Sequence, residues 1–159
     1  MMKSTIFASV ALGLCVVGLT ACGEQPAEEA LPEGMADVAV TNGRIVLPAV
    51  KGNPAALYFD ITNNGSDYLM LRKVQVQGGK GAKMHDTVEQ GGVTGMAPIG
   101  GINVTAGAPV SLKPGGKHVM INELDPGLQA GGTTPVALTF VGGDQYQFDA
   151  KIEAPGGAD

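Results

Sequence analysis

Residues 53–65 read NPAALYFDITNNG, and their alternation of side chains decides the fold class. Leu57, Phe59 and Ile61 are separated by single residues of a different kind, and the run ends at an Asn-Asn-Gly turn signal. A two-residue period is typical of a β-strand with one buried face. Asn and Gly together favour a tight turn. We therefore predict a strand here that contributes one face to a core.

The same alternation recurs through the rest of the chain. No later stretch sustains a helical period for three turns, and 25 glycines and 10 prolines interrupt the sequence at short intervals. Residues 38–154 are therefore predicted to form a single all-β domain, a sandwich with Greek-key connections. The alternating positions are Leu69 and Leu71, followed after a possible bulge by Val74 and Val76; Val110 and Leu112; Val136, Leu138 and Phe140; and Tyr146, Phe148, Ala150 and Ile152.

The first 21 residues have the pattern of a secretory signal. Lys3 precedes an apolar run at 6–19 that is too short for a comfortable membrane span. The sequence LTAC at 19–22 resembles the lipobox of bacterial lipoproteins, which implies cleavage before Cys22 and acylation of that cysteine. Gly23 then implies export onward to the outer membrane, so we expect a lipid anchor on the periplasmic face of the envelope. The alternative is an ordinary cleaved signal with a coincidental cysteine.

Two short segments flank the predicted domain, and the charge and the cysteines of the mature chain argue against two functional classes. Residues 22–37 are acidic and poor in large apolar side chains, which predicts a flexible tether, and 155–159 form a short tail. The mature chain would carry nine basic and fifteen acidic residues, which disfavours nucleic-acid binding. Cys15 would be removed with the signal and Cys22 capped by lipid. A blue-copper centre needs a cysteine thiolate and is therefore excluded.

Both histidines lie in one segment with methionines at short spacing. The pattern is His85, ten residues, Met96, twenty-one residues, His118, one residue, Met120. Imidazole and thioether without thiolate form a ligand set suited to copper, and soft thioethers favour Cu(I) over Zn(II) or Mg(II). These four residues are the candidate metal ligands.

Strand geometry explains how such a set could converge. In a strand leaving the Pro-Gly-Gly turn at 114–116, Val119 faces the core, whereas His118 and Met120 share the opposite face. A hairpin turn at 90–93 would bring His85 and Met96 roughly opposite each other on neighbouring strands. Core packing is expected for Met35 and Met70. It is also preferred for Met84, although that residue could supply a spare thioether.

The four-residue pattern resembles the copper motif of the periplasmic PCuAC-type copper chaperones, with every spacing satisfied. The flanking text NPAALYFDITNNGSDYL and LKPGGKHVMINEL is similar to that family as well, and the likeness covers about residues 38–153. The resemblance implies a cupredoxin-like β-sandwich that binds one Cu(I) through His85, Met96, His118 and Met120. It also implies delivery of copper to assembly of respiratory oxidase, such as cytochrome c oxidase, or to other periplasmic acceptors. The ending KIEAPGGAD lacks the His- and Met-rich extension of some members, so a second copper site is not expected.

Two other readings compete with the chaperone. The sequence gives little support for an enzymatic function. The chain has no Gly-X-Ser-X-Gly elbow, no phosphate-binding glycine loop before a helix, and no histidine beyond the two proposed ligands. The stronger competitor is a metal-free β-sandwich envelope lipoprotein that acts as a protein-binding module. Lys83 and Lys117 flank two of the ligands and are read as solvated rim charges, with guidance of an acidic partner as the alternative.

Overall fold

A computed structural model describes residues 35–156 of the chain. The predicted signal peptide at 1–21, the lipidation site Cys22, residues 23–34 of the tether and residues 157–159 of the tail lie outside the described residues. Within the described part, no helix is long and apolar enough to cross a membrane.

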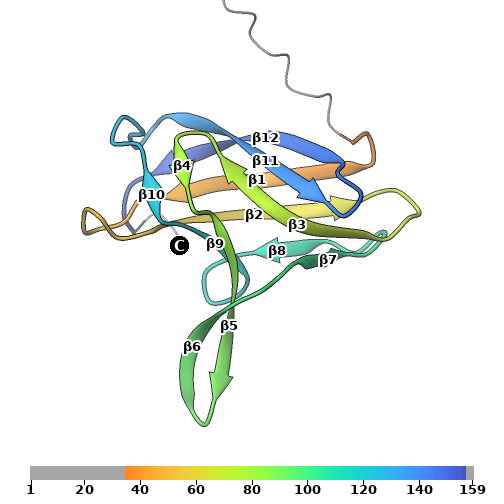
Figure 1. Ribbon diagram of the computed structural model, residues 1–159, viewed down its shortest axis with the longest axis horizontal. Helices are drawn as coiled ribbons and strands as arrows, with labels where there is room; N and C mark the ends of the chain where they lie inside the picture. The colour runs from red at the N-terminus through yellow and green to blue at the C-terminus, as the bar shows by residue number, and fades with distance from the viewer. Residues whose placement is uncertain (1–34, 157–159) are drawn as a thin grey trace, which may run out of the picture. The chain divides into compact units, whose positions relative to one another are not determined.

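The described residues form strands and connecting turns with no helix, which confirms the all-β prediction (Figure 1). One hydrogen-bonded path runs in the order β6-β5-β9-β2-β1-β12-β11-β3-β7, with β8 paired to β2 and a separate β10-β4 pair. Named strands pair antiparallel except β1 and β12. The strands are β1 (Val38–Val46), β2 (Ala55–Asn63), β3 (Leu69–Val76), β4 (Gly79–Lys80), β5 (Lys83–Gln90), β6 (Val93–Pro98), β7 (Ile102–Val104), β8 (Val110–Leu112), β9 (His118–Ile121), β10 (Glu123–Leu124), β11 (Thr133–Phe140) and β12 (Gln145–Glu153).

Strand β2 occupies the middle of this arrangement, and its sequence shows why. Every second side chain from Ala55 to Asn63 is buried, as the alternation predicts. Its two edges pair with β1 on one side and with β8 and β9 on the other. Neighbours on both edges provide hydrogen-bond partners for the backbone of β2, and the apolar side chains on one face of the strand pack in the core.

One core joins the strands into a sandwich. Leu57 and Phe59 of β2 pack in the same buried cluster as Leu71 of β3, Val119 of β9 and Leu138 of β11. The predicted break within β3 is confirmed, because the pairing of β3 with β11 shifts register between Thr139 and Phe140. A bulge of this kind places two residues of one strand against one of its neighbour.

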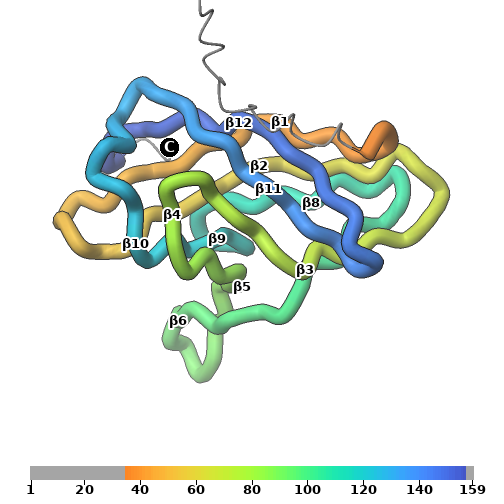
Figure 2. The backbone as a smooth tube through the Cα atoms, turned by 45° about the horizontal axis from the view of Figure 1, so that its top comes forward, coloured from red at the N-terminus to blue at the C-terminus, as the bar shows by residue number. Residues whose placement is uncertain are grey.

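The β5–β6 hairpin projects away from the other strands as an arm, and this is visible in both views (Figures 1 and 2). Gln90 pairs with Val93, so the loop between the strands has only two residues, Gly91 and Gly92. Both glycines have positive φ, which is what a two-residue hairpin loop requires. The predicted turn is therefore confirmed. The arm begins where β5 leaves β9, after His85.

Candidate metal centre

Strand β9 separates core side chains from site side chains as the alternation predicts. Val119 and Ile121 are fully buried in the core. His118 and Met120 face the other way, where Met120 is half-buried. His118 is only 5% exposed, because neighbouring side chains of β2 and β5 flank its ring.

Strand β5 places His85 directly against His118. The two residues are Cα partners in the antiparallel ladder, and their rings stack with centroids 5.9 Å apart and planes 20° apart. Directly opposite residues lie on the same face of a sheet. Met84 is instead the partner of Val119 and is 6% exposed within the core. The preferred core position of Met84 is confirmed, and its thioether points away from the histidines.

Strand β6 contributes Met96, at a register that differs from the expectation. Met96 pairs with Thr87, and His85 pairs with Pro98, so His85 and Met96 are diagonal rather than opposite. The two-residue loop at 91–92 fixes this offset, since the register of a hairpin follows from its loop length. Both residues still lie on the face of His118 and Met120. Diagonal neighbours are roughly 7–8 Å apart, within reach of long side chains.

The four candidate ligands therefore share one surface across three adjacent strands. They differ in exposure, because Met96 lies on the arm and is 62% exposed, whereas the β9 pair is packed against the sandwich. The sequence predicts core packing for Met35 and Met70, but both side chains are only partly buried. Met35 packs against the core cluster, and the Met70 sulfur lies 4.0 Å from an Arg72 nitrogen.

Backbone carbonyls orient both imidazoles in the same way. His118 Nδ1 lies 2.8 Å from the Gly116 oxygen, and His85 Nδ1 lies 3.2 Å from the Lys83 oxygen. A carbonyl oxygen only accepts hydrogen bonds, so each Nδ1 carries the proton. In the neutral form of each ring, Nε2 is then the nitrogen with the lone pair, and this is the form of histidine that binds a metal.

An aromatic side chain that was not predicted from the sequence as part of the site, Tyr58, lies beside His118. The Tyr58 ring of β2 lies 6.5 Å from the His118 ring, and the Arg44 guanidinium of β1 lies 5.3 Å from the centre of the Tyr58 ring. Burial raises the pKa of the Tyr58 phenol, while the Arg44 charge lowers it by less. The alternation in β2 predicts that Tyr58 lies on the face opposite to the core. It does not predict that β9 lies alongside and places His118 next to Tyr58.

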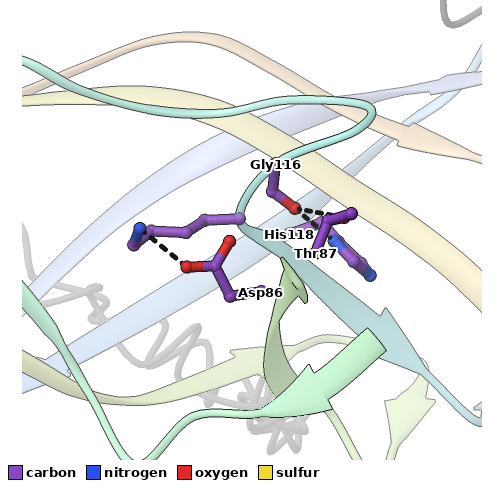
Figure 3. A network of polar contacts seen from close by, with 5 residues as sticks. Asp86, Thr87, Gly116 and His118 are labelled. Atoms are coloured by element: carbon purple, nitrogen blue, oxygen red, sulfur yellow. Dashed lines mark hydrogen bonds and ion pairs between the residues drawn. The ribbon is translucent and has the colours of Figure 1, made fainter. Parts of the chain in front are cut away.

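Polar contacts tie the arm to the turn before β9 (Figure 3). Lys117 Nζ lies 2.9 Å from Asp86 Oδ2, so Lys117, expected from the sequence to be a solvated rim charge, forms an ion pair with Asp86. Thr87 Oγ1 donates to the Gly116 oxygen at 3.2 Å, the same oxygen that accepts the His118 bond. Thr87 was not singled out from the sequence.

The donor set at this place is mixed. Among residues 35–156, no group of three or more His, Cys, Asp or Glu side chains is placed to hold a metal ion. A metal bound here would therefore use thioethers beside the two imidazoles. Two neutral nitrogens and two sulfurs suit a soft, singly charged ion.

Solved structures of similar fold include PCuAC domains. The copper-bound PCuAC domain from PmoF2 matches with a TM-score of 0.62 at 19% identity, covering 75% of this chain and 94% of that one. The apo PCuAC domain from PmoF1 matches at 0.61 and 25% identity, covering 75% and 95%. CuI-DR1885 from Deinococcus radiodurans matches at 0.57 and 22% identity, covering 82% and 85%. These matches confirm the cupredoxin-like β-sandwich and the predicted resemblance.

Sequence comparison supplies the family. A relative in Leifsonia xyli subsp. xyli, named "Putative lipoprotein Lxx21020", is 28% identical over 161 residues, covering 99% of this chain and 93% of the relative. The family model described as "Putative lipoprotein LpqE-like" matches residues 38–152, which include every candidate ligand. The chain belongs to the LpqE-like lipoprotein family.

Proposed function

We propose that this protein is a copper chaperone that holds one Cu(I) between His85, Met96, His118 and Met120. The observation that carries the proposal is the stacked His85–His118 pair, with each Nδ1 against a backbone carbonyl oxygen and two methionines on the same face. The names of the structural relatives, one copper-bound PCuAC domain and one CuI protein, support copper as the cargo. The assignment of Cu(I) rests on the thioethers, because soft ligands favour the lower oxidation state.

Transfer would proceed by ligand exchange, and the proposed function is binding and delivery rather than catalysis. Met96 is the most accessible of the four ligands, so it is the one an incoming donor can replace with least disturbance of the sandwich. An acceptor that offers thiolates would then draw the ion away by affinity. The proposed acceptors are periplasmic copper proteins, such as those that assemble the copper sites of respiratory oxidase.

The anchor is part of the same proposal. The family and the Leifsonia relative carry the name lipoprotein, which supports an exported chain anchored by lipid at Cys22. Neither name specifies the outer membrane, so we propose attachment to the cell envelope.

An anaerobic titration of the full-length protein with Cu(I), against a competing chelator, tests the function. We expect one tight equivalent for the wild type and a large loss of affinity for His85→Ala, whose half-exposed side chain can be removed with little effect on the core. Absence of tight binding in the wild type would contradict the chaperone and favour the metal-free protein-binding module.

A further inference from the structure

The backbone ladder between β5 and β9 ends at the pair His85 and His118, where the arm departs. Continuing the same register would set Asp86 opposite Lys117 and Thr87 opposite Gly116. Side-chain contacts take the place of the ladder at both positions, namely the Lys117–Asp86 ion pair and the Thr87–Gly116 hydrogen bond. The arm is therefore held to the turn before β9 by two side chains.

These two contacts lie on different faces of the arm. Asp86 is adjacent to His85 in the strand and faces away from the candidate ligands, whereas Thr87 shares the face of His85. The Lys117 and Asp86 side chains are both partly exposed, and an ion pair of this kind contributes little stability. Of the two contacts, only the Thr87–Gly116 hydrogen bond lies on the face of the candidate ligands.

The acceptor of the Thr87 bond is also the atom that orients His118. Gly116 O accepts from Thr87 Oγ1 at 3.2 Å and from His118 Nδ1 at 2.8 Å (Figure 3). A carbonyl oxygen has two lone pairs, so it can accept both bonds at once. The Gly116 oxygen therefore helps to fix both the position of Thr87 and the orientation of the His118 ring.

Thr87 is also the Cα partner of Met96 in the β5–β6 ladder. We propose that Thr87 is a positioning residue, which holds the arm ligand Met96 at a fixed place relative to His118. The inference rests on the proposed function, because it assigns a role in assembling that metal site. It predicts that removing the hydroxyl loosens the arm and separates Met96 from the three ligands on β5 and β9.

The test compares Thr87→Val, which keeps shape and strand preference, with Thr87→Ser, which keeps the hydroxyl. Thr94→Val is the matched control, because Thr94 is an exposed threonine of the same arm. We expect Thr87→Val to weaken Cu(I) binding by about 10- to 100-fold, the range typical of residues that orient metal ligands. Thr87→Ser and Thr94→Val should stay near wild type. X-ray absorption at the copper edge should show one sulfur fewer in Thr87→Val.

A second readout needs no metal. Amide hydrogen exchange of the metal-free full-length protein should become faster at residues 88–95 in Thr87→Val, while β2 and β11 stay protected. Wild-type affinity and an unchanged sulfur count in Thr87→Val would overturn the inference, as would unchanged exchange in the arm. Absence of Cu(I) binding by the wild type would refute the proposed function instead, and the exchange data would then still decide whether Thr87 holds the arm.

Discussion

Neighbouring residues of β5 show how one strand can serve the core and the site. Met84 is buried against Val119, and the next residue, His85, stacks on His118 at the opposite face. The two methionines closest in sequence to a histidine, Met84 and Met120, therefore differ in position although both lie within strands. Side-chain alternation accounts for the difference.

Truncation of Met84 should mainly lower the stability of the fold, whereas truncation of Met120 should mainly weaken Cu(I) binding. Met84→Ala is expected to lower the free energy of unfolding by about 2–5 kcal/mol, because it leaves a cavity in the core. Met120→Ala should cost about 1 kcal/mol or less without metal, since its side chain is half-buried, yet it should weaken Cu(I) binding. Urea unfolding of the metal-free proteins and chelator competition measure the two effects. A larger stability loss for Met120→Ala than for Met84→Ala would contradict these roles.

Tyr58 gives a second test at this scale. Burial raises the pKa of its phenol above the ordinary value of 10.0 despite Arg44. A raised folded-state pKa means that the contribution of Tyr58 to stability is complete below about pH 10 and is lost as pH rises through the folded value. Absorbance at 295 nm should show one phenol titrating late, and Tyr58→Phe should remove that phase. Loss of an early phase instead would show that Tyr58 is not shielded.

The β5–β6 arm shows which features of the strands could be predicted from the sequence and which could not. The faces of β2 and β9 and the turn at 90–93 followed from alternation and from glycine, which act locally. The offset between His85 and Met96 depended on which residues form the last pair before the loop. The contact of Thr87 with Gly116 and that of Tyr58 with His118 depend on which distant strands become neighbours. No local pattern carries that information.

The loop of the arm offers a prediction of its own. Gly92 has a φ of 78°, and a Cβ there would meet nothing within 4 Å, so Gly92→Ala introduces backbone strain alone. The cost is about 1–2 kcal/mol and falls on the arm. We expect roughly tenfold weaker Cu(I) binding with little change in global unfolding, because the arm opens locally.

Gly107→Ala is the matched control for Gly92→Ala. Gly107 has a φ of 71° and equally open surroundings, but it lies in the β7–β8 connection rather than in the arm. Its replacement should leave Cu(I) affinity unchanged. Equal losses of affinity in both variants would show that the arm has no special part in binding.

In the whole molecule, the candidate site lies toward the β6 end of the strand order, on the face of β5 and β9 opposite to their core side chains. We expect loading and release of a metal there to involve the arm and not the packing of the sandwich. Anchoring, which we propose at Cys22, is a separate property of the chain. Together the two proposals describe a metal-binding domain attached to the envelope.

Replacement of the anchor residue tests the second of these properties. Cys22→Ser should abolish labelling of the protein by palmitate, because the acyl chains are expected on this cysteine. Cys15→Ser is the control, because Cys15 is the other cysteine of the chain and lies within the predicted signal. Palmitate labelling that survives Cys22→Ser would contradict lipidation at this residue.

The most direct test of the central claim is X-ray absorption of the Cu(I)-loaded protein, comparing the wild type with Met96→Leu/Met120→Leu. Leucine keeps the volume of methionine and removes the sulfur, so the fold should persist. We predict two sulfur and two nitrogen neighbours for wild-type copper, and loss of both sulfurs in the double variant. Met35→Leu/Met70→Leu should match the wild type. An unchanged sulfur signal in the Met96/Met120 variant would contradict the site.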